Sequence, residues 1–211
     1  MKSIQMNKEM TRAILDGRKV QTRRVIKVRT DIDRKEWIDT LAPDYSKYQK
    51  DETVWVREPA RILSYYVQMD RSNIELEYQY LADGDICKLE DIPERFIEFG
   101  DTATMPRWIY KHQGIPNGCI KEMARIFLKV TNIRVERLQD IEHEDILQEG
   151  FPLDYEIKNS TKIYYDDSDF DIDRTYEWWI DLWNSTAPKG YKWEDNPYVL
   201  VCEFEMVKEV I

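Results

Sequence analysis

The stretch ARIFLKVTNIRVER, from Ala124 to Arg137, is the strongest strand signal in the chain. Apolar and polar residues alternate along it with the period of a half-buried strand. The apolar positions are Ile126, Leu128, Val130, Ile133 and Val135. The alternation breaks near Asn132, which favours a bulge or bend of the kind that barrels use to turn corners. A long, bent strand of a mixed or closed sheet is therefore predicted.

The segments around this strand predict shorter elements. Apolar spacing predicts helices over 8–17 and 175–185, and helical turns over 138–150 that end at Gly150. Alternating or apolar runs predict strands over 53–58, 61–70, 74–81 and 198–207. This order of elements indicates an α+β fold in one domain over 1–211, with insertions at about 85–122 and 154–174.

The helix over 175–185 carries an aromatic stripe. Trp179, Leu182 and Trp183 recur at i, i+3 and i+4, which places them on one helix face. Such a stripe is more often core than a cofactor site, so we expect this face to pack on the sheet.

An acidic segment over 166–173 precedes this helix. Asp167, Asp169 and Asp171 fit the first ligand positions of an EF-hand loop. Ile172 stands where that loop needs Gly, and Trp178 stands where it needs Glu. The segment is therefore predicted to be a solvated acidic loop without a metal.

Charge narrows the classes of partner. With 31 Lys and Arg against 41 Asp and Glu, the formal net charge of the chain is −10. Proteins that coat nucleic acid are usually basic, because counterion release supplies their affinity. A local basic patch, or a pocket for a single nucleotide, stays compatible with this charge.

Other counts predict a cytoplasmic chain without a metal or cofactor. No apolar run is long enough to span a membrane, and the first residues lack the apolar core of a secretory signal. Cys87, Cys119 and Cys202 form no C-x-x-C pair, so neither a zinc ribbon nor a disulfide framework is expected. Two histidines, His112 and His143, are too few for a His-rich metal site.

The segment from Arg18 to Lys27 is the most basic in the chain, with five cations and no carboxylate. Two interpretations are open. The segment is either a solvated basic turn that leads into a strand, or the edge of a ligand site.

Four blocks in order, over 13–24, 54–58, 125–149 and 196–205, resemble an ASCH domain, most closely the larger ASCH-like proteins of bacteriophages and prophages. The Met105–Trp108 block also resembles these phage proteins, although it lies further from Arg125 than expected. The resemblance implies a PUA-like fold, a small mixed β-barrel with flanking helices. It also implies a cleft beside the barrel for RNA or a nucleobase.

Some small ASCH proteins are amidohydrolases that deacetylate N4-acetylcytidine; RNA cleavage, proposed for another member, is the less favoured activity here. Their G-R-K-x-x-T turn matches Gly17–Thr22, and their carboxylate and distal arginine match Glu149 and Arg24. The resemblance implies that Thr22 attacks the amide, Lys19 accepts the proton of Thr22, and Glu149 protonates the leaving amine. Ligand contacts are predicted at Arg18, Arg23 and Arg24, because this cation-rich segment stands where ASCH proteins place their cleft. Trp55 and Trp108 are candidate stacking partners for a base, and packing in the core or on the surface is the alternative for each.

Spacing restricts this mechanism. A three-residue separation places Lys19 and Thr22 on one side of a turn, but on opposite faces of a regular strand, so the mechanism predicts a turn over 18–24.

A second interpretation of the same residues stays open. Lys19 and Arg24 would then hold a phosphate or a carboxylate, Thr22 would cap a turn, and Glu149 would be solvated. The alternative function is a non-enzymatic acidic interaction protein of phage or prophage origin that acts on a host protein.

Overall fold

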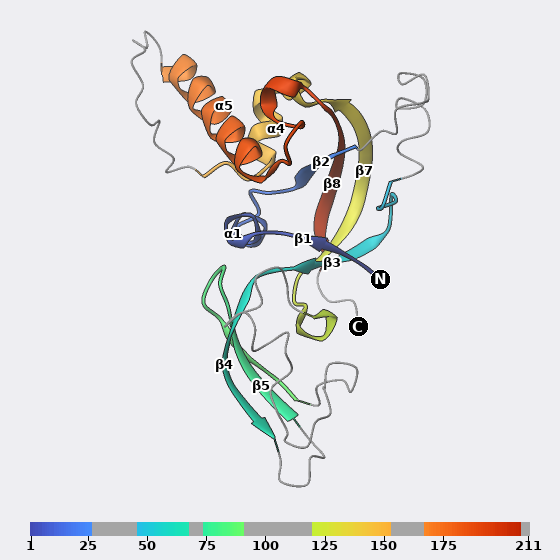
Figure 1. Cartoon of the computed structure of the whole chain (residues 1–211), viewed down its shortest axis with the longest axis vertical. Coiled ribbons are helices and arrows are strands. Elements are labelled where there is room, and N and C mark those ends of the chain that lie inside the picture. Colours follow the sequence, from blue (N-terminus) through green and yellow to red (C-terminus); the bar gives the residue numbers. More distant parts are fainter. Residues whose placement is uncertain (27–45, 68–73, 91–119, 153–166, 208–211) are drawn as a thin grey trace. The chain divides into compact units, whose positions relative to one another are not determined.

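The computed structural model describes residues 1–26, 46–67, 74–90, 120–152 and 167–207 (Figure 1). They form a mixed α+β fold, as predicted, with one five-stranded and one three-stranded sheet. The elements are β1 (Lys2–Gln5), α1 (Lys8–Leu15), β2 (Gln21–Val25), β3 (Thr53–Arg57), β4 (Ala60–Val67), β5 (Ile74–Tyr80), β6 (Ile86–Leu89), η2 (Lys121–Met123), β7 (Phe127–Arg137), η3 (Leu138–Asp140), α4 (His143–Gln148), α5 (Asp167–Thr186), η4 (Trp193–Asp195) and β8 (Tyr198–Val207). No helix among these is both long and apolar enough to cross a membrane.

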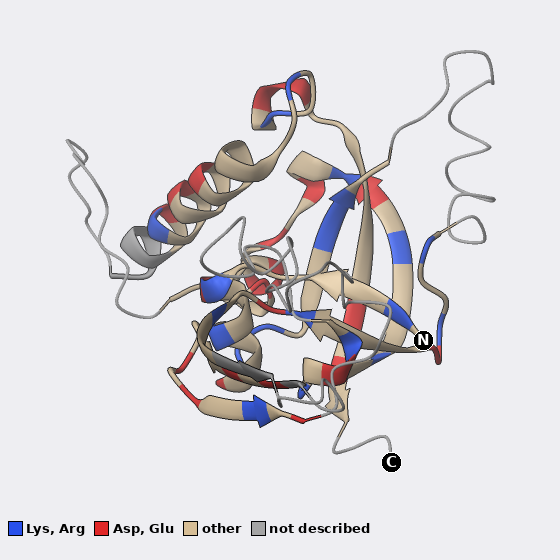
Figure 2. Ribbon diagram, turned by 60° about the horizontal axis from the view of Figure 1, so that its bottom comes forward, with Lys and Arg blue, Asp and Glu red and all other residues tan. Residues whose placement is uncertain are grey.

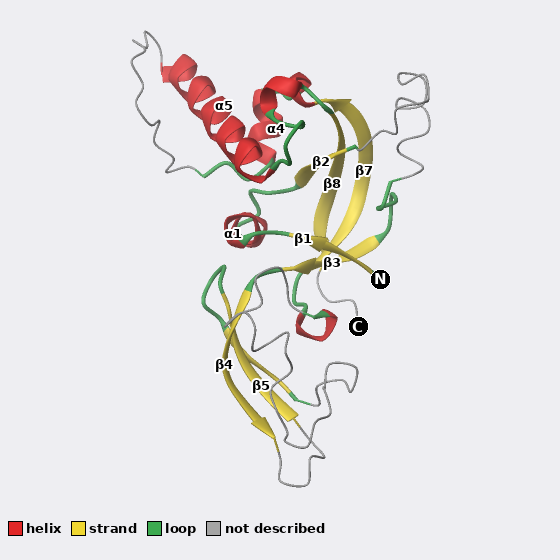
Figure 3. Cartoon of the chain, in the orientation of Figure 1, coloured by secondary structure: helices red, strands yellow, loops and turns green. Residues whose placement is uncertain are grey.

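The strands pair in two sheets (Figure 3). The larger sheet has the order β1-β3-β7-β8-β2, and the smaller has the order β4-β5-β6. β1 and β3 are parallel, whereas β2 and β8 are antiparallel with Arg23 opposite Val201. The chain divides into two compact units, which we describe separately: Met1–Arg12 with Val54–Leu128 and Val207–Ile211, and Ala13–Thr53 with Lys129–Met206.

The first unit contains the predicted hairpin. β4 pairs with β5 in antiparallel register, with an irregularity between Ile62 and Ser64. Ile86–Leu89, at the start of the predicted insertion over 85–122, form β6 and pair with β5. The strand has only four residues and no wholly buried face, so its sequence pattern is weak. Residues 91–119, which include Trp108 and Cys119, lie outside the described residues.

An ion pair between the buried Glu58 and the partly exposed Arg125 joins two of the blocks that carry the resemblance to ASCH domains. Arg125 donates from Nε to Glu58 Oε1 at 3.0 Å and from Nη2 to Glu58 Oε2 at 2.9 Å. Its guanidinium also lies 3.7 Å from the ring centroid of Tyr80. Burial raises the pKa of Glu58, while the Arg125 hydrogen bonds and charge act in the opposite direction. Glu58 and Arg125 therefore have a structural role within the first unit.

The second unit buries the aromatic stripe of α5. Trp179 and Trp183 pack with residues of η3, α4 and β8, and Leu182 is half-buried against the same cluster. The other buried members are Leu138, Ile141, Ile146, Val199 and Val201. Figure 1 shows α4 and α5 beside the strands β2 and β8. The predicted packing of this helix face on the sheet is confirmed.

α5 is longer at its N-terminus than predicted. The prediction of a solvated acidic loop over 166–173 is wrong for Asp167–Asp173, which form the first two turns of the helix. The helix macrodipole favours negative side chains near the N-terminal end, and four of these seven residues are Asp. The acidic run is therefore compatible with a helix start.

Candidate functional site

The basic segment follows α1 and lies in the second unit. Gly17 adopts φ +74°, which confirms the predicted end of the helix. Lys19 then pairs with Glu149 in an isolated antiparallel bridge, and Gln21–Val25 form β2 against β8. The prediction of a turn over 18–24 is therefore wrong for Gln21–Val25, because pairing with β8 extends this backbone.

Side chains alternate along β2, and their contacts follow the alternation. Gln21 donates to the Asp145 carboxylate and carbonyl, and Arg23 donates to Glu136. On the opposite face of the strand, Arg24 Nη1 donates to Thr22 Oγ1 at 2.9 Å. The strand therefore separates Gln21 and Arg23 from Thr22 and Arg24.

Lys19 and Glu149 form a buried ion pair. Lys19 Nζ donates to Glu149 Oε2 at 2.6 Å and to the Glu149 carbonyl at 3.0 Å. The two side chains are 0% and 2% exposed. Burial lowers the pKa of Lys19; Glu149 acts against this, while Arg24 and Arg23 lower the pKa further. The interpretation of Glu149 as a solvated residue is wrong, because its carboxylate faces two buried cations.

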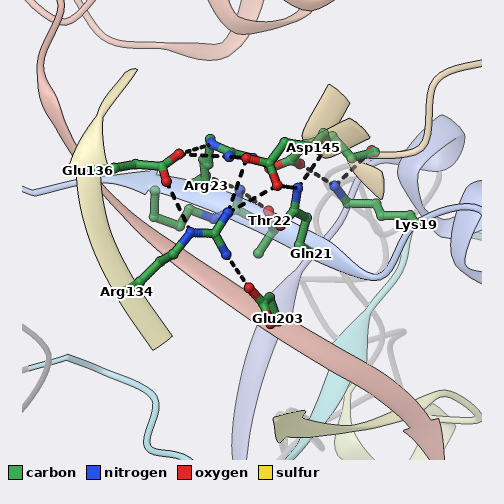
Figure 4. A network of polar contacts seen from close by, with 10 residues as sticks. Lys19, Gln21, Thr22, Arg23, Arg134, Glu136, Asp145 and Glu203 are labelled. Atoms are coloured by element: carbon green, nitrogen blue, oxygen red, sulfur yellow. Dashed lines mark hydrogen bonds and ion pairs between the residues drawn. The ribbon is translucent and has the colours of Figure 1, made fainter. Parts of the chain in front are cut away.

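Arg23 is enclosed by carboxylates from several elements (Figure 4). Its Nη2 lies 2.7 Å from Glu136 Oε1 and 2.7 Å from Asp145 Oδ2. Its Nη1 lies 3.0 Å from Glu149 Oε1, and its guanidinium carbon lies 5.8 Å from the Trp179 ring centroid. The guanidinium predicted to contact a ligand thus contacts protein groups.

Arg134 extends this network toward β8. It contacts Glu136 and Asp145, each at 3.0 Å, and also Glu203. Burial acts to raise the pKa of Asp145, but the hydrogen bond from Gln21 and the charges of Arg23 and Arg134 hold that pKa below its usual value. We use the name carboxylate network for these seven residues: Lys19, Arg23, Arg134, Glu136, Asp145, Glu149 and Glu203.

The carboxylate network has three cations and four carboxylates, so its formal charge is 3 − 4 = −1. Figure 2 shows basic and acidic positions interleaved along the strands of the second unit. The basic segment is therefore no solvated turn, since Lys19 and Arg23 are buried among acidic groups. Sequence reasoning missed Arg134, Glu136, Asp145 and Glu203; the four-residue spacing of Asp145 and Glu149 was the available signal.

The thiol of Cys202 lies opposite Thr22 and is a second possible nucleophile besides the Thr22 hydroxyl. Thr22 and Cys202 are register partners on β2 and β8, and both are buried. Burial raises the pKa of Cys202 to about 11, so this thiol is protonated near neutral pH. Thr22, with its hydroxyl held by Arg24, is the better candidate nucleophile on this face.

Arg18 and Trp55, the other two residues predicted to contact the ligand, lie outside the carboxylate network. Arg18 Nη1 donates to the carbonyls of Gly150 and Phe151 at 2.9 and 3.1 Å, and so fixes the chain that follows Glu149. Trp55 is buried in β3 of the first unit, and its stacking on a base stays a prediction. Within the described ranges, no group of three His, Cys, Asp or Glu side chains is arranged to hold a metal ion.

Gly150 allows the Glu149 segment to approach Lys19. Its φ is +98°, and an added Cβ would lie 2.8 Å from Ala13 Cβ and 3.1 Å from Lys19 Cβ. We expect Gly150→Ala to lower the free energy of unfolding by about 2–5 kcal/mol, the sum of left-handed backbone strain and overpacking. Chemical denaturation measures this change.

Gly190→Ala is the matched control for this substitution. Gly190 has φ +85° but no atom within 4 Å of an added Cβ, so only backbone strain is expected, about 1–2 kcal/mol. Equal losses in the two variants would contradict the close approach at Gly150.

We compared the chain with protein-family models, curated proteins and solved structures, and none of the three comparisons found a match. The resemblance to ASCH domains therefore rests on the sequence blocks, and the chemistry of the site rests on its geometry.

Proposed function

We propose that this chain is an ASCH-type protein of PUA-like fold that binds a modified pyrimidine nucleoside and hydrolyses its N-acyl amide. The observation that carries the proposal is the buried hydrogen bond between Lys19 and Glu149. Two groups matched to the amidohydrolases are 130 residues apart in sequence and yet in contact. The proposal also includes the fold that the resemblance implies: a small β-barrel with flanking helices, and insertions at about 85–122 and 154–174.

The Lys19–Glu149 pair suits amide hydrolysis because it holds both proton-transfer groups. Transfer of one proton along the 2.6 Å contact converts the ion pair into a neutral amine and a carboxylic acid. Burial lowers the pKa of Lys19, which favours its neutral amine. The neutral amine is a competent base, and the carboxylic acid is a proton donor.

The reaction balances with these groups. In the proposed reaction Thr22 Oγ1 attacks the acyl carbon, and its proton passes to Lys19 Nζ. Lys19 precedes β2 (Gln21–Val25), so the alternation of that strand does not by itself place the Lys19 side chain on the face opposite Thr22. The C–N bond breaks as Glu149 protonates the leaving amine, which leaves an acyl ester on Thr22. Water then attacks the ester and gives a proton to Glu149, and Lys19 returns its proton to the Thr22 oxygen as the C–O bond breaks. The carboxylic acid is released, and Thr22, Lys19 and Glu149 are restored.

The charges favour a free nucleoside over an RNA strand as the substrate. Arg23 and Arg134 contact carboxylates, and the carboxylate network has a formal charge of −1. Affinity for RNA depends largely on cations that neutralise phosphates. An uncharged nucleoside needs no such cations, which supports a modified cytidine as the ligand class.

A matched pair of variants tests the proposal. Thr22→Val keeps the shape of the side chain without its hydroxyl, and we expect at least a roughly 10³-fold loss of kcat on N4-acetylcytidine. Thr22→Ser keeps the hydroxyl and should retain measurable turnover. Acetate release measures both rates, and thermal unfolding checks that both variants fold.

The wild-type protein decides between the alternatives. Binding of N4-acetylcytidine without acetate release would leave a recognition module and remove the enzyme. Neither binding nor hydrolysis of nucleosides or short RNAs would favour the non-enzymatic acidic interaction protein, for which the net charge of −10 is the supporting observation.

A further inference from the structure

We propose that Arg23 is a positioning residue that orients the Glu149 carboxylate toward Lys19, and that it does not contact the ligand. This inference rests on the proposed amidohydrolase function. It assigns to Arg23 a role different from the ligand contact that the sequence resemblance implies.

The two oxygens of Glu149 have different partners. Oε1 accepts from Arg23 Nη1 at 3.0 Å, and Oε2 accepts from Lys19 Nζ at 2.6 Å. The backbone N–H of Glu149 donates to the carbonyls of Asp145 and Ile146, so the residue is also held at the end of α4. Loss of the Arg23 contact would free the carboxylate to rotate away from the Lys19 amine.

Arg23 is itself held from more than one element. Glu136 on β7 and Asp145 on α4 bind the other side of its guanidinium, and the side chain is 0% exposed. A planar guanidinium matches several carboxylates at once, whereas an ammonium group is a single compact charge. Lys at this position would keep the positive charge but lose the orientation.

Arg134 provides the matched control. It shares Glu136 and Asp145 with Arg23, but its third carboxylate is Glu203 and not Glu149. Variants at Arg134 therefore remove similar ion pairs without changing the contacts of the reacting carboxylate.

The experiment compares Arg23→Gln, Arg23→Lys and Arg134→Gln with the wild type on N4-acetylcytidine, measuring kcat, KM and the pH–rate profile. A pair that acts with one shared proton gives a bell-shaped profile. The charged and titratable groups around this pair are Arg23 and Arg24 on β2, Glu136 on β7, Asp145 on α4 and Cys202 on β8.

We expect Arg23→Gln to lower kcat about 10²-fold with little change in KM, because orientation and proton transfer are affected but binding is not. Loss of the positive charge should move the profile to higher pH by about one unit. Arg23→Lys should keep the pH position of the profile and lose part of kcat. Arg134→Gln should stay within about threefold of the wild type.

Two results would overturn the inference. A higher KM with unchanged kcat in the Arg23 variants would make Arg23 a ligand contact. The same loss of kcat and the same profile shift in Arg134→Gln would make both effects general consequences of a disturbed network.

A measurement that does not depend on activity tests the role of Arg23 even if Arg23→Gln does not fold or the wild type shows no hydrolysis. NMR titration of the Lys19 side chain in the wild type, Arg23→Lys and Arg134→Lys applies even if Arg23→Gln does not fold. We expect the chemical shift of the Lys19 side chain to change in Arg23→Lys, with its titration midpoint kept, and to stay the same in Arg134→Lys. A chemical shift unchanged in both variants would contradict the positioning role. A wild type without hydrolysis would refute the proposed function, and the titration would still decide the role of Arg23.

Discussion

Replacing Glu149 with Ala is expected to lower the free energy of unfolding by about 3–5 kcal/mol, because the change leaves buried cations without their carboxylate. Lys19 Nζ would lose its partner at 2.6 Å, and Arg23 Nη1 would lose its partner at 3.0 Å. Denaturant unfolding followed by circular dichroism measures the loss.

Glu203→Ala is the control for this effect. Its carboxylate contacts Arg134, but it is 32% exposed, so water replaces the lost contact. We expect a loss of only about 0–1 kcal/mol for such an exposed pair. The double variant Lys19→Met with Glu149→Leu should recover part of the Glu149→Ala loss, because no unpaired ammonium is then buried. A loss below about 1 kcal/mol in Glu149→Ala would show that the pair is hydrated.

Replacing Trp183 with Ala is expected to lower the free energy of unfolding by about 3–5 kcal/mol, because it opens a cavity between α5 and the sheet. Trp183 packs with the cluster that includes Trp179 and Val201. Its Nε1 also donates to the Tyr191 carbonyl at 2.8 Å, and that acceptor would lose its donor. Denaturant midpoints and slopes give the change.

Asp181→Ala, on the exposed side of the same helix, separates packing from helix propensity. Asp181 is exposed, so we expect a change within about 0.5 kcal/mol. A Trp183→Ala loss below about 1 kcal/mol would contradict the assignment of this helix face to the core.

The long periodic elements could be predicted from the sequence. β7, β8 and the aromatic part of α5 follow from apolar spacing, because burial of one face requires that spacing. β1 and β6 could not be predicted in this way, since each has four residues and draws its hydrogen bonds from a neighbouring strand. The acidic start of α5 has a composition typical of a loop, and its helical state depends on local helix electrostatics.

The site could be predicted only in part. The resemblance led to Lys19 and Glu149, and the structure brings these two residues into contact. The sequence also predicted a ligand contact at Arg23. In the structure the Arg23 guanidinium lies between the carboxylates of Glu136, Asp145 and Glu149. In a strand, Thr22 and Arg23 lie on opposite faces. The sequence over 18–24 fits a turn as well as a strand, so it does not predict this separation.

The sequence by itself determined the α+β class, the long strand over Phe127–Arg137 and the buried face of α5, because apolar periodicity is a local property of the chain. Only the tertiary structure decided that Gln21–Val25 of the basic segment form a strand and that Lys19 and Arg23 are buried. The carboxylates that neutralise Lys19 and Arg23 lie more than 100 residues further along the chain. Whether a cation faces water or a buried carboxylate depends on those distant groups, since burial of a charge is stable only beside its partner.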